Sequence, residues 1–180
     1  MCTIIGGVYL LDVKVLKAPY YVSFDTFVLE PYVYDDEIIT RVIERRQEFL
    51  VKEKPLQIVK NSINLYGGSF KQATHYAKQV IGNYHKTPII VAHDYGIPYI
   101  FIPTLSPNSD HNVWIASHSI DNYSAVPQGC MVYLENNQAV KVNVSFNTIA
   151  RQYSFANTLG KRFDKVRRHL NNPHEFFDLI

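Results

Sequence analysis

The spacing of apolar residues predicts a chain that begins with strands and acquires helices later. Four early segments are rich in β-branched and aromatic side chains, as strands are: 3–11, 21–30, 37–43 and 47–53. The last two flank Glu44-Arg45-Arg46, and the stretch 36–50 also fits a single helix. Residues 1–53 are therefore predicted to form a strand-rich N-terminal part.

Beyond Pro55 the apolar period becomes helical. The three-four-three spacing of Leu56, Val59, Ile63 and Tyr66 predicts a helix that begins at Pro55 and stops at Gly67. After Gly67-Gly68, the capping box Ser69-Phe-Lys-Gln72 predicts the start of a second helix, which runs to Ile81. Lys71, His75 and Lys78 lie on its face opposite the apolar stripe.

Hairpin patterns follow. Two apolar runs, Thr87–His93 and Ile97–Pro103, flank the turn Asp94-Tyr-Gly96. Residues 104–112 read as a loop, and Val113–Asp121 as one strand that contains Trp114. The runs Cys130–Leu134 and Ala139–Ser145 flank Glu135-Asn-Asn-Gln138 as a further hairpin.

From Asn147 the pattern is helical again up to Leu170, with basic residues on the face opposite the apolar stripe. The predicted fold class is thus α+β: a single domain over residues 1–180, with antiparallel β-hairpins, two central helices and a long basic C-terminal helix over 147–170. A chain of 180 residues is long enough to bury a core without cross-links.

The order of charges adds the strongest functional signal. The net charge is only +2, from 18 Lys and Arg against 16 Asp and Glu. Residues 54–93 nevertheless contain five lysines and no acid, and residues 136–170 contain seven basic residues against Asp164. Positive charge gathered on part of a surface attracts extended anions such as nucleic acid, whereas the plain alternative is ordinary solvated helix faces.

The two basic helices supply the candidate contacts to DNA, which are Lys60, Lys71, Lys78, Arg151, Lys161, Arg162, Lys165 and Arg168. If they share one surface, we expect contacts to about 6–8 phosphates and an affinity that falls steeply with salt. Tyr66, Tyr76 and Tyr84 lie among the lysines, and such rings also stack on unpaired bases. A single-stranded nucleic-acid binder and a protein-interaction module for an acidic partner are therefore the alternatives.

Enzyme chemistry finds little support, and we expect no catalytic residue, metal site or cofactor. His93-Asp94 resembles part of a triad, but no nucleophile motif surrounds Cys130. The spacing of His93, His111 and His118 matches no metal motif. Gly67-Gly68-Ser69 precedes a helix but lacks the GK[ST] of a Walker A loop.

The cellular location is predicted from two observations: the chain has only two cysteines, Cys2 and Cys130, far apart in the sequence, and it shows no export signal. The apolar start has no basic region typical of a signal peptide, and no stretch approaches 18 apolar residues. We therefore expect a cytoplasmic protein without a membrane partner.

A series of short motifs runs in order through residues 54–163. They are Lys54-Pro-Leu-Gln-Ile-Val59, Tyr66-Gly-Gly-Ser69, Tyr84-His-Lys-Thr-Pro-Ile89, Phe101-Ile-Pro-Thr-Leu-Ser106, Trp114-Ile115 with Ser117-His118, and Val144-Ser-Phe-Asn-Thr148 with Gln152-Tyr153. In these motifs the chain resembles the ComK family, the competence transcription factors of Gram-positive bacteria. Residues 1–53 resemble it more loosely.

The resemblance implies an activator that binds promoters of DNA-uptake genes as an oligomer and reads paired A/T-rich boxes of double-stranded DNA largely through the minor groove. It also implies RNA polymerase and a MecA-like proteolytic adaptor as partners. Some relatives carry the adaptor's target in a C-terminal tail, whereas this chain stops at His174-Glu-Phe-Phe-Asp-Leu-Ile180. The segment Arg46-Gln-Glu-Phe-Leu50 resembles that tail a little but sits upstream, in a predicted strand.

Minor-groove reading agrees with the charge pattern, because the narrow groove of an A/T tract has an enhanced negative potential that attracts Arg and Lys. We expect Arg151, Arg162 and Arg168 to enter such a groove. The lysines are expected to hold backbone phosphates.

Overall fold

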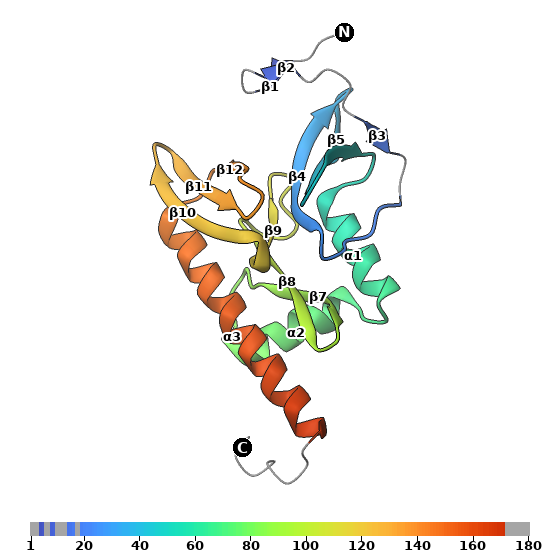
Figure 1. Ribbon diagram of the computed structural model, residues 1–180, viewed down its shortest axis with the longest axis vertical. Helices are drawn as coiled ribbons and strands as arrows, with labels where there is room; N and C mark the ends of the chain where they lie inside the picture. Colours follow the sequence, from blue (N-terminus) through green and yellow to red (C-terminus); the bar gives the residue numbers. More distant parts are fainter. Residues whose placement is uncertain (1–3, 6–7, 10–13, 17–18, 172–180) are drawn as a thin grey trace.

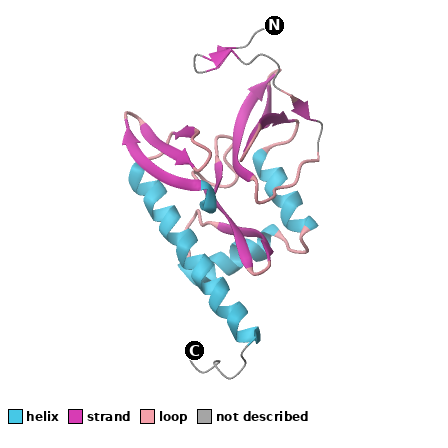
Figure 2. Ribbon diagram, viewed as in Figure 1, coloured by secondary structure: helices cyan, strands magenta, loops and turns pink. Residues whose placement is uncertain are grey.

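The computed structural model describes residues 4–5, 8–9, 14–16 and 19–171, and it is an α+β fold (Figures 1 and 2). Its three α-helices are α1 (Pro55–Leu65), α2 (Phe70–Ile81) and α3 (Phe146–Asn171). The strands are β1 (Ile4–Ile5), β2 (Val8–Tyr9), β3 (Val15–Leu16), β4 (Thr26–Tyr34), β5 (Glu37–Glu44), β6 (Glu48–Val51), β7 (Ile89–Asp94), β8 (Ile97–Pro103), β9 (Trp114–Ala116), β10 (Ile120–Val126), β11 (Gly129–Leu134) and β12 (Ala139–Val142).

A seven-stranded sheet in the order β3-β6-β5-β4-β9-β8-β7 organises the molecule. All its neighbours are antiparallel except the pair β3 and β6. The sheet joins two blocks of the chain, one from the first 51 residues and one from residues 89–116. The seam between them is the short pairing of β4 with β9, in which Val28 lies opposite Ile115 and Leu29 opposite Trp114.

Alternation along the strands divides the apolar residues of this sheet between its two faces. In β8, Phe101 packs in a cluster with Leu29, Trp114 and α1 residues such as Ile58. Its neighbours Ile100 and Ile102 belong to a second cluster that includes inward residues of α3. Helix α1 therefore covers one face of the sheet, and α3 packs on the other.

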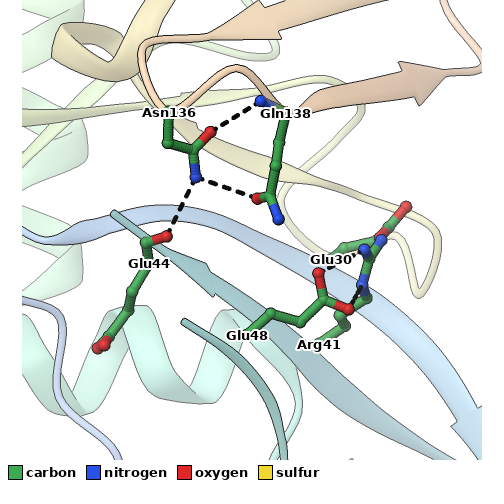
Figure 3. Close-up of polar contacts among 6 residues, drawn as sticks. All are labelled: Glu30, Arg41, Glu44, Glu48, Asn136 and Gln138. Carbon is green, nitrogen blue, oxygen red and sulfur yellow. Dashed lines mark hydrogen bonds and ion pairs between the residues drawn. The ribbon is translucent and has the colours of Figure 1, made fainter. Parts of the chain in front are cut away.

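A separate three-stranded sheet, β10-β11-β12, supplies further residues to the second cluster. Figure 1 shows it beside the first half of α3. Its β11–β12 turn is tied to the large sheet, because the Asn136 amide Nδ2 donates to the main-chain oxygen of Glu44 at 3.2 Å (Figure 3). Helix α3 thus packs against both sheets.

Most predicted elements are confirmed. Residues 37–44 and 48–51 are strands, which excludes the alternative helix over 36–50. Both central helices, the two predicted hairpins at 87–103 and 130–145 and the long C-terminal helix are present. Of the predicted strand 3–11, only 4–5 and 8–9 fall within the described residues, where they form a two-stranded pair.

Two predicted strands differ from the structure. The strand expected over 21–30 begins at Thr26 and continues through Pro31 to Tyr34. Proline has no N–H to donate to a neighbouring strand, but β9 pairs only with Val28 and Leu29, so no strand lies beside Pro31 on the β9 side of β4. The single strand expected over Val113–Asp121 is wrong. A 3-10 turn at Ser117–Ser119 divides it into β9 of the large sheet and β10 of the small one.

Candidate nucleic-acid interface

Helix α2 presents a short row of basic side chains to solvent. Its start is fixed by Ser69, whose Oγ accepts the Gln72 main-chain N–H at 3.2 Å, as the capping motif predicts. At about 100° per residue, Lys71, His75 and Lys78 then lie within about 60° of one another. Lys71 and His75 are exposed and Lys78 is half-buried, so the row is accessible to a ligand.

Lys60 of α1 lies at the start of this row. Its Nζ stands 5.6 Å from the centroid of the Phe70 ring, over the first residue of α2. A cation over an aromatic face is held electrostatically by the ring. The ammonium group is thereby positioned at the junction of the two helices.

The basic residues of α3 divide between two faces of the helix. Arg151 and Arg162 are eleven residues apart and differ by only about 20° around the helix axis. Both face the α2 region. Burial raises the pKa of Tyr76 in α2, and the positive charge of Arg162 opposes that rise. Arg151 interacts electrostatically with Lys86, which follows α2 in the chain. Lys161 and Arg168 lie about 80° and 100° around the helix from Arg151, Lys165 lies between them and Arg151 at about 40°, and all three are exposed.

Lys86, in the connection between α2 and β7, ties α3 to the rest of this region. Its Nζ donates to the Thr104 main-chain oxygen at 2.9 Å, and its own main-chain oxygen accepts from the Gln152 amide of α3 at 3.1 Å. Burial, together with the charge of Arg151, lowers the pKa of the Lys86 ammonium. The structure therefore brings positive charge from the α2–β7 connection and from α3 side by side.

One predicted contact residue is partly neutralised within α3 itself. Arg168 pairs with Asp164 at 2.6 Å, and the same carboxylate receives Arg167 at 3.0 Å. These two guanidinium groups hold the pKa of Asp164 below its usual range. The end of α3 therefore presents less free positive charge than its sequence suggests.

Two arginines of the N-terminal half, Arg41 and Arg45, are also engaged by carboxylates. Arg41 lies between Glu30 and Glu48, at 2.9 and 2.8 Å (Figure 3), and Arg45 contacts Asp25 at 3.2 Å. By contrast, six predicted contact residues form no ion pair with a carboxylate of the described residues: Lys60, Lys71, Lys78, Arg151, Lys161 and Arg162. Free basic side chains are therefore present on α1, α2 and α3, and Arg46, Lys52 and Lys141 elsewhere in the described chain also form no ion pair with a carboxylate.

The three tyrosines among the lysines are engaged with the protein to different degrees. Tyr66 donates its hydroxyl to the Val22 main-chain oxygen at 2.7 Å, and Tyr76 is half-buried. Tyr84 packs its ring on Phe155 of α3, with centroids 4.9 Å apart, and remains partly exposed. The single-strand alternative, which needs free rings for stacking, is weakened at Tyr76, whereas Tyr66 and Tyr84 remain 49% and 45% exposed.

The side chains considered for other chemistry lie on different elements. His93 is exposed on β7 of the large sheet, whereas Cys130 is buried in β11 of the small one. His118 contacts the Phe24 main-chain oxygen at 3.0 Å. Across the part of the chain that the structure describes, no group of three His, Cys, Asp or Glu residues is arranged to hold a metal ion, and no helix has the length and apolarity to cross a membrane.

The segment that resembles an adaptor target is built into the core. Within Arg46–Leu50, Phe49 and Leu50 are buried in β6, which pairs with β3 and β5 in the large sheet. An extended recognition motif needs its apolar side chains exposed, so this segment is a poor target in the folded state. The tail 174–180 lies outside the described residues.

Sequence reasoning missed Gln152 as a positioning residue. It is a buried amide within the apolar stripe of α3, and its contact with Lys86 joins elements 66 residues apart. The signal was present as a polar residue at a position of the apolar stripe, between Ile149 and Ala156. A buried amide needs partners; here Nε2 donates to the main-chain carbonyl of Lys86, whereas Oε1 accepts no hydrogen bond from the protein.

The family model described as ComK protein matches residues 17–168. The competence transcription factor of Bacillus subtilis (strain 168) is 27% identical over 159 residues, which cover 87% of this chain and 82% of the relative. No solved structure matches the chain. Because the family match spans most of the sequence, including α1, α2 and nearly all of α3, the chain belongs to the ComK family.

Proposed function

We propose that this protein is a cytoplasmic transcription regulator of competence genes that binds double-stranded DNA with the basic side chains of α2 and α3. The observation that carries the proposal is the family match over residues 17–168, together with a relative named as a competence transcription factor. The charge distribution supports it, because cations free of carboxylate partners gather on these helices while Arg41 and Arg45 are paired.

The finer proposal is that the protein reads A/T-rich boxes largely through the minor groove. Arg151 and Arg162 are the best candidates to enter a narrow groove, since they share a face of α3, with Arg162 near Tyr76 of α2 and Arg151 near Lys86. Lys60, Lys71 and Lys78 then hold phosphates on one side, and Lys161 and Lys165 hold phosphates on the other. Arg168 contributes less because Asp164 already binds it.

Titration of a promoter duplex at several salt concentrations tests the DNA-binding role. The double variant Lys161→Ala/Lys165→Ala is expected to weaken binding to all duplexes alike and to reduce the slope of log K against log salt by about 2, since each lost phosphate contact removes about 0.9. The matched control is Arg45→Ala/Arg46→Ala, which removes the same net charge from the N-terminal half and is expected to leave the slope unchanged.

Equal effects of the two double variants would mean that net charge alone governs binding, and would overturn the assignment to α3.

A footprint on a promoter with spaced A/T boxes tests the selectivity. If such DNA fails to compete with a bound acidic protein, the protein-interaction alternative replaces the proposal. Self-association and contacts with RNA polymerase or a MecA-like adaptor, which the family resemblance implies, stay predictions.

A further inference from the structure

A groove about 420 Å³ in volume lies between α2, β7 and the end of α3. The turn between α1 and α2 and four residues of β7 contribute to its lining, and α3 contributes Phe163 and Val166. Its size falls within the roughly 300–1,000 Å³ of typical ligand sites, so it has room for several side chains of a partner segment. The basic row of α2, Lys71, His75 and Lys78, does not line it.

The groove follows the free edge of β7. Among the described strands, β7 pairs with β8 alone, so no strand lies beside its other edge. The consecutive residues 90–93 of β7 all line the groove. Side chains alternate between the two faces of a strand, so an unbroken run of lining residues places the groove along the strand edge and not over one face. Main-chain groups at such an edge can pair with a further extended segment.

Apolar side chains at the groove are only partly covered. Tyr66 is 49% exposed and Val166 is 38% exposed, and both line the groove. At the end of β7 the turn to β8 adds Tyr95 and Ile97, which are more exposed still. Large apolar side chains gathered at one open site are typical of a surface that binds another segment.

The end of α3 lies against the same end of β7. The side chain of Arg167 packs on the β7–β8 turn so closely that a Cβ on Gly96 would lie under 3.0 Å from it. The ring centroids of Phe163 and His93 are 5.5 Å apart, and both residues line the groove. The chain that follows α3 therefore starts beside the groove.

Residues 172–180, which lie outside the described residues, are long enough to follow the groove. Nine extended residues span up to about 30 Å. The six residues of β7 span about 20 Å, and the end of α3 is about 7.5 Å beyond Val166. Pro173 disfavours a continuation of the helix, so a change of direction is expected there.

The composition of this segment complements the groove. Its apolar side chains are Phe176, Phe177, Leu179 and Ile180, and Glu175 and Asp178 give it a charge of −2 without any Lys or Arg. Among the described residues no carboxylate lines the groove. Arg162, which forms no ion pair with a described carboxylate, acts electrostatically on Tyr76 in the lining. An acidic segment with aromatic side chains therefore matches both the apolar lining and the charge beside it.

We propose that residues 174–180 of the same chain bind this groove in an extended conformation along the free edge of β7, with their aromatic and aliphatic side chains against its lining. An extended segment beside a strand edge gains main-chain hydrogen bonds, while its alternate side chains enter the adjoining pocket. The contact does not require the proposed DNA-binding role. While bound, the segment is withheld from any other protein that would recognise it.

Chymotrypsin cleavage of the full-length protein tests the contact, because this protease cuts after Phe176 and Phe177. Val166→Glu places a carboxylate in the groove at an exposed position of α3. It is expected to speed cleavage in the segment at least about tenfold, since the rate tracks the population of the released state. The matched control Val33→Glu makes the same change at an exposed position of β4 and is expected to leave the rate unchanged. Mass spectrometry separates these cuts from cleavage elsewhere.

Hydrogen exchange measures the other side of the contact. Phe176→Ser/Phe177→Ser removes the aromatic groups from the segment and leaves the groove itself unchanged, so the amides of residues 90–93 are expected to exchange faster than in the parent protein. The control Asn172→Ser/His174→Ser alters the same segment without removing an apolar group and is expected to exchange like the parent. Exchange in α1 is expected to be equal in all three proteins.

Two results would overturn the proposal. Equal cleavage of the Val166→Glu, Val33→Glu and parent proteins, with equal exchange at β7, would mean that the segment does not occupy the groove. Protection of β7 that survives Phe176→Ser/Phe177→Ser and grows with protein concentration would identify a second copy of the chain as the occupant. Neither readout involves DNA, so both outcomes stay distinct from a failure of the proposed function.

Discussion

Ser62→Ala tests how strongly one buried hydroxyl holds α1 against the N-terminal chain. Ser62 is fully buried, and its Oγ accepts the main-chain N–H of Val22 at 3.0 Å while donating to the Ile58 main-chain oxygen at 2.7 Å. Val22 is also fully buried. The substitution therefore leaves a dry N–H without an acceptor.

The expected cost follows from that orphaned donor. An unsatisfied buried polar group destabilises the folded state by about 1–3 kcal/mol. The carbonyl of Ile58 loses less, because it also accepts the main-chain bond of the helix. Alanine has a higher helix propensity than serine, which offsets about 0.5 kcal/mol of the loss.

The control is Thr158→Ala in α3. Thr158 donates to the main-chain oxygen of Ser154 at 3.0 Å in the same helical manner, but it is exposed and holds no distant group. Its substitution gains a similar helix propensity, so the difference between the two variants isolates the contact with Val22. We expect Ser62→Ala to be less stable than Thr158→Ala by about 1–3 kcal/mol.

Urea unfolding measures this difference. For a slope of about 2 kcal/mol/M, a loss of about 2 kcal/mol lowers the midpoint by about 1 M. Hydrogen exchange at the Val22 amide is expected to accelerate in Ser62→Ala alone. If the two variants unfold within about 0.5 kcal/mol of each other and protect Val22 equally, the reasoning from the buried donor is wrong.

Two further predictions concern stability. Burial lowers the pKa of His118, so the folded state resists a proton that the unfolded chain accepts below about pH 6.5, and the free energy of unfolding should fall between pH 7 and pH 5. Denaturation at a series of pH values should show a smaller fall in the variant His118→Gln, and an equal fall would exclude His118 as its source. A Cβ on Gly129 would lie under 3.0 Å from the Val142 main-chain oxygen, so Gly129→Ala should cost about 1–3 kcal/mol in thermal unfolding. Gly160→Ala, where a Cβ meets only Ile100 at 3.4 Å, should instead stabilise α3 by up to about 1 kcal/mol; equal midpoints for the two variants would contradict the steric argument.

The helices were predictable because their signals are local. Pro55 and Gly67 bound α1, Ser69 caps α2, and the apolar stripe of α3 persists through the whole element. The division of 113–121 was not predictable in this way. Ile115 and Ile120 are both apolar, and the turn at Ser117–Ser119 exists because the chain passes from one sheet to another.

The candidate site was predictable in composition but only partly in arrangement. Charge order identifies α2 and α3 as the basic elements, and helical rotation identifies which residues share a face. Rotation alone does not say that Arg162 lies beside Tyr76, or that Arg168 is bound by Asp164, because these contacts depend on packing and on competition among nearby charges. The pairing of Lys86 with Gln152 likewise joins distant parts of the chain.

The narrow seam between β4 and β9 affects how the protein is made. During synthesis the strands β4, β5 and β6 emerge well before β9, so the hydrogen-bonding edge of β4 that faces β9 stays open until residue 116 has left the ribosome. An open strand edge is a template for wrong pairing with other chains. Nascent chains whose emerged part ends between residues 52 and 116 are therefore expected to be the most exposed to aggregation, and a chaperone that covers this edge would act in that interval.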